Sequence, residues 1–289
     1  MRTWFRSAWM ASVGLTLLVI PAGGQTQAYR APRTADGKPN FNGVWQALNE
    51  ANWDLQAHDA RSGMVTQKGV YDYDYARVPA APVVALGAAA GVPASLGVVQ
   101  GDGKIPYKPE ALTKRSENSK NRAAADPFNK CYKPGTPHMI YLPFPLQIIQ
   151  TPMQVTILSE YMHNTRNLFL TRKSHYPPDS VDLWNGDSVA RFDGDILVTD
   201  VANFNGQAWL DRAGNFASDQ LHVTERFQLI DNDTIRYEAT LEDPKTYTRP
   251  WTIRLLLYRH KEPNVRIMEY ECHAYSEDSL KEPALPTVR

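Results

Sequence analysis

The stretch Leu221–Pro244, LHVTERFQLIDNDTIRYEATLEDP, predicts a β-hairpin with a carboxylate on its apolar face. Four apolar side chains alternate along the first strand and share one face: Leu221, Val223, Phe227 and Leu229. Glu225 falls in the middle of that face, because successive side chains of a strand point to opposite sides. A buried carboxylate is costly unless it is paired or hydrogen-bonded. Glu225 therefore needs a partner or has a chemical role.

The register of this hairpin decides where Glu225 points. If Ile230 pairs with Thr234, Glu225 points into the interior. Arg226 then faces Glu238 on the other side of the sheet, which predicts a cross-strand ion pair. A slip of one residue would turn Glu225 outward.

Three further hairpins are expected around this one. They pair residues 153–161 with 166–172, 188–192 with 195–201, and 248–260 with 265–275. The second has Asp193-Gly194 at its turn, a strong hairpin signal because glycine takes positive φ readily. Strands this close together leave no room for crossover helices, so they pair as an antiparallel meander, which tends to close into a barrel.

A tripeptide near the N-terminus gives a second indication of the fold. Gly43-Val44-Trp45 is a G-x-W, and it resembles the start of lipocalin-like barrels (calycins). That resemblance implies that Trp45 plugs one end of the barrel beneath an arginine from a late strand, here Arg254 or Arg266. The fold class expected is mainly β, a single antiparallel meander closing into a lipocalin-like barrel.

The remaining chain divides into a leader, an arm and the barrel region. Residues 1–28 are interpreted as a signal peptide, residues 29–145 as an N-terminal arm, and residues 146–289 as the barrel, in one domain with the arm. The arm contains the G-x-W, an Ala/Gly-rich segment at 83–103 that suggests a mobile loop or an insertion, and one short surface helix at 107–125 starting near Pro109. Residues 126–152 are proline-rich and expected to be extended and non-helical.

Composition and the first residues limit the cellular setting and the partners. The 31 basic and 31 acidic residues cancel, so nucleic acid and anionic membrane surfaces are not indicated as partners. Two arginines precede the apolar run Met10–Ile20, which is too short to be an integral membrane span and is followed by small residues. The protein is therefore expected to be periplasmic or secreted.

The two cysteines fit this interpretation. Cys131 and Cys272 are the only cysteines of the chain, and in an oxidising compartment an isolated pair is most simply one disulfide. It would join the start of the barrel region to the last strand. The alternative is two buried free thiols.

Several blocks resemble a broad family of secreted bacterial proteins to which no activity is attached. They span nearly the whole mature chain and include PRTADGKPNFNGVW, DPFNKCYKPGTP, WNGDSVARFDGDILVTD, LHVTERF and YEATLEDPKTYTRPW. Where that family more usually has Gly-His-Ser, this chain has Gly186-Asp187-Ser188. The resemblance implies export and one β-rich domain.

The candidate catalytic residues are Glu225, His222 and His175. A carboxyl on an apolar face could act as a general base or acid at neutral pH, or could simply be paired with an interior arginine. His222 lies near the end of its strand, and His175 lies in a loop rich in functional side chains. The seven histidines have no metal-ligand spacing, so neither a metal nor a cofactor is expected.

The candidate ligand-binding residues are mostly aromatic. They are Arg166, Trp184, Asn205, Trp209, Tyr237 and Trp251. The long connection FNGQAWLDRAGNF, which contains Asn205 and Trp209, was expected to form a lid over a barrel mouth.

These features favour an exported barrel that binds a small, partly apolar molecule with a polar end. The ligand would enter beside Trp209 and be held by Glu225 and Arg166. One alternative is a cofactor-free periplasmic enzyme, an isomerase, lyase or hydrolase with Glu225 as base. Another is a structural envelope protein with a filled interior. The sequence does not indicate an oligomeric state.

Overall fold

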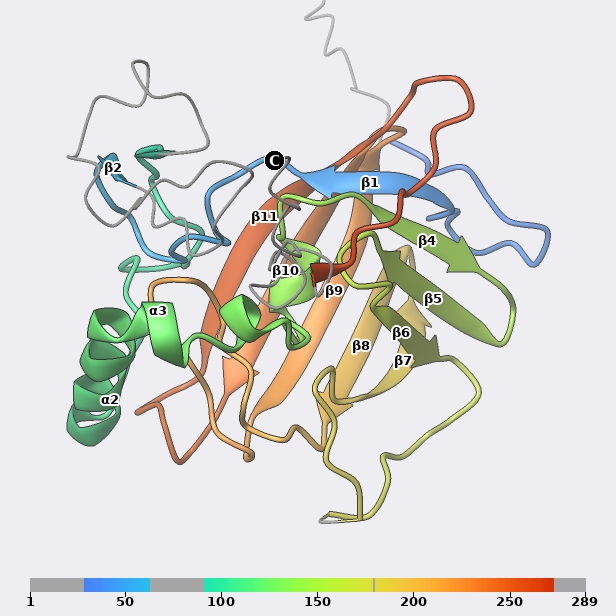
Figure 1. Ribbon diagram of the computed structural model, residues 1–289. Coiled ribbons are helices and arrows are strands. Elements are labelled where there is room, and N and C mark those ends of the chain that lie inside the picture. The colour runs from blue at the N-terminus through green and yellow to red at the C-terminus, as the bar shows by residue number, and fades with distance from the viewer. Residues whose placement is uncertain (1–28, 63–90, 179, 273–289) are drawn as a thin grey trace, which may run out of the picture.

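The computed structural model describes residues 29–62, 91–178 and 180–272, and its main feature is a closed barrel of nine strands (Figure 1). Around the ring the order is β1, β11, β10, β9, β8, β7, β6, β5, β4, so the mainly β, lipocalin-like architecture is confirmed. The strands are β1 Gly43–Ala47, β4 Leu146–Gln150, β5 Gln154–Ser159, β6 Thr165–Phe169, β7 Asp187–Asp193, β8 Ile196–Ala202, β9 His222–Asp231, β10 Thr234–Glu242 and β11 Trp251–Arg259. The expected signal peptide lies outside the described residues.

The central hairpin has the expected register. In the β9–β10 pair, Glu225 lies opposite Ala239 and Phe227 opposite Tyr237. The turn differs from the prediction, because Thr234 pairs with Asp231 and a bulge restores the register one residue later. Glu225 therefore points into the barrel, where its residue exposure is 0%.

The outer face of the hairpin is arranged differently from the prediction. Arg226 and Glu238 are cross-strand neighbours, but Glu238 forms its ion pair with Arg254 of β11, at 2.6 Å. Arg226 lies 3.9 Å from Asp193. Each strand of a barrel has a neighbouring strand on both sides, so Glu238 has one arginine on β9 and another on β11 within reach. The sequence of the β9–β10 hairpin alone does not predict which of the two forms the ion pair.

The expected hairpin of residues 248–260 with 265–275 is wrong. Of its second half, residues 265–271 are largely exposed and form no strand, and residues 273–275 lie outside the described part. The edge of β11 is taken by β1, with Trp45 opposite Arg259, and β1 pairs with β4 on its other side. Strand β1 closes the ring. Its tryptophan and two further apolar residues are buried, so its pairing removes more apolar surface from water than pairing of the charged segment after β11 would.

Trp45 plugs the barrel as the G-x-W resemblance implied, but with a different arginine. The guanidinium carbon of Arg259 lies 4.0 Å from the centre of the Trp45 ring, and the indole N–H donates to the Phe41 carbonyl at 2.9 Å. Neither Arg254 nor Arg266 takes this place. Gly43 has a φ of +145°, and a Cβ there would collide with the Arg259 guanidinium, which explains the glycine.

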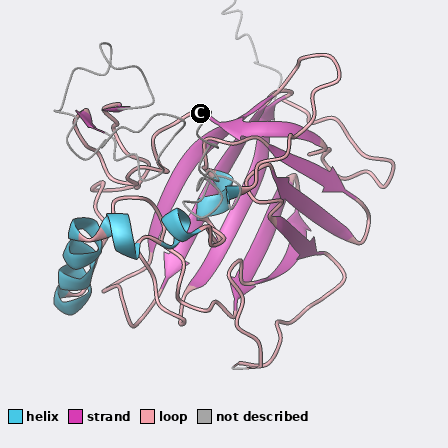
Figure 2. Cartoon of the chain, viewed as in Figure 1, coloured by secondary structure: helices cyan, strands magenta, loops and turns pink. Residues whose placement is uncertain are grey.

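The helices lie on one side of the barrel (Figure 2). Helix α2 is Pro109–Lys120, as expected, and continues after a break as α3 Arg122–Ala125. The prediction that residues 126–152 are non-helical is wrong, because this segment contains the 3-10 turns η2 Pro127–Lys130 and η3 His138–Ile140. The Asp126 carboxylate accepts from the Phe128 N–H at 2.9 Å and starts the first of these turns.

The described part of the Ala/Gly-rich segment is packed, contrary to the expectation of a mobile loop. Its short strand β3, Gly91–Val92, pairs with β2, Arg61–Ser62. Val98 and Val99 are buried, and Val99 bridges to Ile253 of β11. Residues 83–90 of this segment lie outside the described part.

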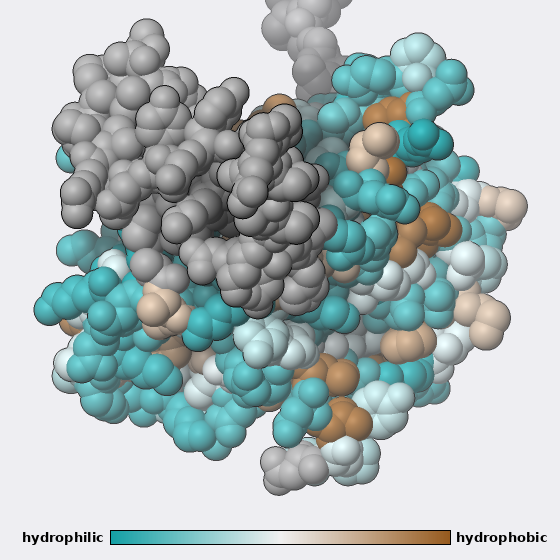
Figure 3. All heavy atoms as spheres, viewed as in Figure 1, coloured by the Kyte–Doolittle hydropathy of each residue, from teal (hydrophilic) through white to brown (hydrophobic). Residues whose placement is uncertain are grey.

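The disulfide is confirmed between Cys131 and Cys272, with a Cα–Cα distance of 5.4 Å. It joins the end of η2 to the segment that follows β11 rather than to a last strand. A disulfide is typical of proteins in oxidising compartments. The described residues visible in Figure 3 are mainly hydrophilic, with scattered apolar side chains. Across the described residues, no helix combines the length and apolarity that a membrane span requires.

Candidate functional site

The barrel wall is weakest between β6 and β7. These strands meet in parallel through one residue pair, Phe169 with Val189, whereas β5–β6 pairs over five residues and β7–β8 over seven. The chain between them, residues 170–186, is too long for a hairpin turn and brings β7 back alongside β6 in the same direction. A cavity of about 550 Å³ lies at this seam.

Both strands and the connecting segment line this cavity, which we call the seam cleft. Its aromatic lining residues are Phe169, Tyr176 and Trp184, and its polar ones include Thr165, Arg166, Asn167, Asp187 and Ser188. Asp187 and Ser188 are adjacent on β7, so their side chains point to opposite sides of the wall. Ser188 contacts the interior arginine, and Asp187 contacts the loop that folds over the outside.

The inner side of the seam cleft ends at a buried ion pair. The Arg166 Nη1 donates to Glu225 Oε1 at 2.9 Å, and its Nη2 contacts Oε2, so the two groups meet through two parallel hydrogen bonds. The exposed fraction of the two side chains is 1% and 0%. The Arg166 Nε also donates to the Ser188 hydroxyl at 3.0 Å. Glu225 is thus paired with an interior arginine, as one of the sequence alternatives held.

Two hydroxyl groups complete the surroundings of Glu225. Thr199 of β8 donates to Oε2 at 2.5 Å, and Tyr237 of β10 donates to Oε1 at 2.7 Å. Burial alone would raise the pKa of the Glu225 carboxyl, but the Arg166 charge and these hydrogen bonds bring that pKa below its ordinary value. Glu225 is therefore a charged, fully satisfied group, unlike a general base that titrates near neutral pH.

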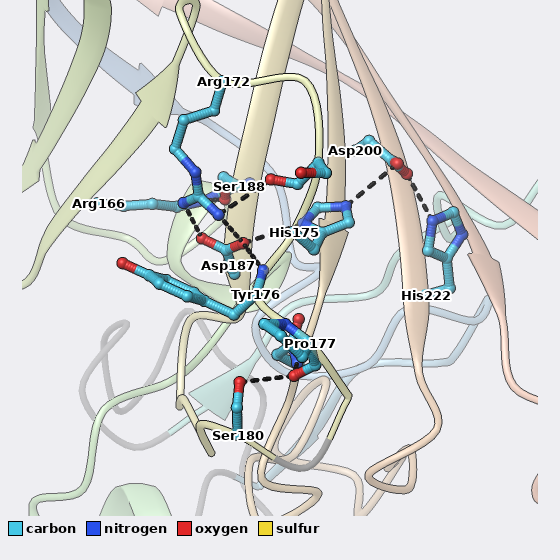
Figure 4. A network of polar contacts seen from close by, with 12 residues as sticks. Arg166, Arg172, His175, Tyr176, Pro177, Ser180, Asp187, Ser188, Asp200 and His222 are labelled. Atoms are coloured by element: carbon cyan, nitrogen blue, oxygen red, sulfur yellow. Dashed lines mark hydrogen bonds and ion pairs between the residues drawn. The ribbon is translucent and has the colours of Figure 1, made fainter.

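A second polar cluster holds the connecting segment on the outer wall (Figure 4). Arg172 donates to both oxygens of Asp187, at 2.6 and 2.9 Å, and the His175 Nδ1 lies 3.1 Å from Asp187 Oδ2. Although burial raises the pKa of Asp187, its hydrogen bonds from Arg172, His175 and the Tyr176 N–H bring the pKa below its ordinary value. Asp187 is thus an acceptor whose hydrogen-bonding capacity is used within the protein.

The cluster continues across β8 to β9. The His175 Nε2 lies 3.2 Å from one oxygen of Asp200, and the His222 Nε2 lies 2.5 Å from the other. These contacts fasten His175 to two strands, and this fixes the adjoining Tyr176 at the cleft.

The structure places the residues that the sequence nominated in several different parts of the molecule. Arg166 and Trp184 line the seam cleft, and Glu225 and Tyr237 lie behind Arg166 in the interior. His175 and His222 share Asp200 on the outer wall. Trp251 is a buried core residue that packs edge-on against Tyr247.

Trp209 belongs to a packed loop rather than to an open mouth, whereas Asn205 of the same loop lines a second cavity, of about 390 Å³, beside α2. Trp209 packs in one buried cluster with Phe216 and with Ala111 of α2. The cavity bordered by Trp184, Asn205 and Trp209 has a volume of about 10 Å³, the space of one water molecule. A ligand entrance beside Trp209 is therefore closed by side chains.

Sequence reasoning missed several groups that shape the cleft. Arg172, Tyr176 and Asn167 were not singled out, because nothing local distinguishes them from surface residues. Thr199 had a usable signal, since it is the residue of β8 that pairs with Glu225. That signal requires the register between two hairpins, which the sequence does not provide.

Comparisons of the chain with protein-family models, with curated proteins and with solved structures gave no match. Among the residues described, no three histidine, cysteine or carboxylate side chains gather in a way that could hold a metal ion.

Proposed function

We propose that the protein binds a small molecule in the seam cleft. The observation that carries the proposal is the cavity of about 550 Å³ at the one place where neighbouring strands of the barrel share a single residue pair. This volume is in the range of roughly 300–1,000 Å³ that small-molecule sites occupy. Aromatic side chains with a few fixed polar groups are also typical of such sites.

The polar end of the ligand would contact Arg166 and Ser188, which line the cleft, whereas Glu225 does not line it. In this proposal Glu225 is a positioning residue. It holds the Arg166 guanidinium in one orientation through two hydrogen bonds.

The two other functions have less support. An acid–base enzyme would need its proton-transfer group beside the substrate, but none of Glu225, His175 and His222 lines the cleft. A purely structural barrel agrees with the paired Glu225 and the closed space at Trp209, but it gives no role to the seam cleft.

The binding site would operate outside the cytoplasm, in the periplasm or the surrounding medium. The apolar run Met10–Ile20 after two arginines and the disulfide between Cys131 and Cys272 support this location.

The test is to identify what the protein carries. We would purify the wild type from its native periplasm and record native mass spectra beside two variants. Thr165→Trp adds bulk at an exposed position of β6 that lines the cleft, and Thr240→Trp makes the same change on β10, away from it. A small molecule that is retained by the wild type and Thr240→Trp, and lost from Thr165→Trp, would support the proposal. A wild type that carries nothing, and whose thermal unfolding no compound of a metabolite library shifts, would refute it.

A further inference from the structure

The inner end of the seam cleft offers hydrogen-bond donors. Ser188 has 2% residue exposure, lines the cleft and accepts from the Arg166 Nε at 3.0 Å. Among the described residues, no acceptor takes the hydroxyl hydrogen of Ser188. A buried O–H beside a cavity is costly to leave unpaired, so a ligand atom that accepts it would be favoured.

Arg166 adds a second donor at the same place. Three of its five N–H groups are used within the described residues, one by Ser188 and two by Glu225. A guanidinium is planar, and one of the two remaining N–H groups lies parallel to the Nε–H on the same edge. That edge is the one that faces Ser188. An oxygen placed there could accept from both residues.

The side-chain acceptors next to Ser188 and Arg166, in contrast, are already used, whereas Asp182, which also lines the cleft, is exposed to solvent. Both oxygens of Asp187 accept from Arg172, and one also accepts from His175 and from the Tyr176 N–H. The Asn167 side-chain oxygen accepts from the Thr156 hydroxyl at 2.9 Å, which leaves the Asn167 amide as a donor. The inner end of the cleft therefore suits a ligand group that accepts hydrogen bonds better than one that donates them.

The charges at the inner end of the cleft cancel in pairs. Arg166 is neutralised by Glu225, and Asp187 by Arg172. A buried anionic group at that depth would add a negative charge without a compensating partner, because Lys133, which also lines the cleft, is exposed to solvent. Such a charge is costly in a low-dielectric site. An uncharged acceptor, such as a carbonyl oxygen, avoids this cost.

We propose that the ligand is an uncharged ring compound whose carbonyl oxygen accepts from the Ser188 hydroxyl and from Arg166, as an aromatic ketone, ester or lactone would. The rings of Phe169, Tyr176 and Trp184 would contact the flat part of the ligand. This inference rests on the proposed function and adds the chemical class of the ligand.

The first test compares three probes of similar size on the wild type: acetophenone, 1-phenylethanol and benzoate. Affinities come from ligand-observed NMR, and the carbonyl stretch of ¹³C-labelled acetophenone is recorded by infrared difference spectroscopy. We expect acetophenone to bind about tenfold more tightly than either of the others, the effect of one to two net hydrogen bonds. We also expect its carbonyl stretch to shift to lower frequency on binding.

Two matched variants place the effect at Ser188. Ser188→Ala is expected to weaken acetophenone binding about threefold to tenfold and to reduce the carbonyl shift, with little change for 1-phenylethanol. Thr165→Ala removes a hydroxyl that also lines the cleft but donates to the His163 carbonyl at 3.3 Å, and it should leave the order of the probes unchanged. Because the order of the probes is measured on the wild type, this test does not depend on the folding of any variant.

The outcomes separate the two proposals. Tighter binding of benzoate or of 1-phenylethanol than of acetophenone, when it is abolished by Thr165→Trp, would overturn the carbonyl inference and leave the cleft as a binding site. If the three probes bind and Thr165→Trp does not weaken their binding, both the carbonyl inference and the proposal of a binding site in the seam cleft are overturned.

Discussion

Removing both partners of the Arg166–Glu225 pair should destabilise the fold by less than the two single removals added together. Glu225→Leu leaves a guanidinium with a side-chain exposure of 1% and no counter-charge. Breaking a buried ion pair in this way costs about 3–5 kcal/mol, which is roughly 6–20 °C in Tm for a protein of this size. Arg166→Met leaves an unpaired carboxylate and should cost a similar amount.

The double variant Arg166→Met, Glu225→Leu removes both charges and fills the space with apolar atoms. Such replacements are often close to neutral in stability. Here the hydroxyls of Thr199 and Tyr237 would lose their acceptor, and each buried unpaired hydroxyl costs about 1–3 kcal/mol. We therefore expect the double variant to be less stable than the wild type, and more stable than the sum of the two single losses would make it.

The measurement is a double-mutant cycle by urea unfolding, followed by circular dichroism with the disulfide intact. A coupling free energy above about 2 kcal/mol is expected from the cycle. If the two single losses simply add, or if Glu225→Leu costs less than about 1 kcal/mol, the assignment of Glu225 as a buried ionic partner of Arg166 is wrong.

Three further predictions test other parts of the fold. His138 is buried with its pKa lowered to about 3 by desolvation, so the unfolded chain binds its proton first as the pH falls below 6.5. Its contribution should lower the unfolding free energy by about 2 kcal/mol between pH 8 and pH 5, measured as the difference between the pH profiles of the wild type and His138→Gln, because Asp211, whose pKa burial raises to about 7, changes both profiles in the opposite direction. Gly43→Ala should lower the unfolding free energy by about 2–3 kcal/mol, because the residue has a positive φ and its new Cβ would collide with Arg259. Gly101→Ala should lower it by only about 1 kcal/mol, because Gly101 has a positive φ but no atom within 4 Å of the new Cβ. Equal losses of stability for the two variants in thermal melts would contradict the collision at Gly43. Replacing Cys131 and Cys272 by serine opens a loop with a sequence separation of 141, which the chain-entropy model values at about 5 kcal/mol; a urea midpoint within error of the wild type would contradict that value.

The local parts of the fold could be predicted from the sequence. The hairpin around Glu225 and the hairpin at Gly194 are specified by alternation and by turn residues within about ten positions, so their pairing follows from short-range rules. The inward orientation of Glu225 follows from the same alternation.

The closing strand could not be predicted in this way. β1 and β11 come from opposite ends of the described chain, and no local pattern states that Trp45 lies opposite Arg259. The choice of the arginine over the Trp45 ring depends on this pairing too.

The candidate site was only partly predictable, for the same reason. Arg166 and Trp184 were nominated, and both line the cleft. The cleft itself arises because β6 and β7 run parallel after a long connection, whereas the sequence favoured a continuous antiparallel meander. Side chains brought together by that connection, such as Tyr176 and Asp187, share no sequence signal.

The closure of the ring by β1 also has a consequence for the rate of folding. Until β11 has left the ribosome, the edges of β1 and β10 that β11 covers in the closed ring keep unpaired backbone groups. Contacts between such distant segments form slowly, because a large loop must close before any interaction compensates for its lost entropy. The ring therefore stays open until β11 is available, and its open edges can meanwhile pair with other chains.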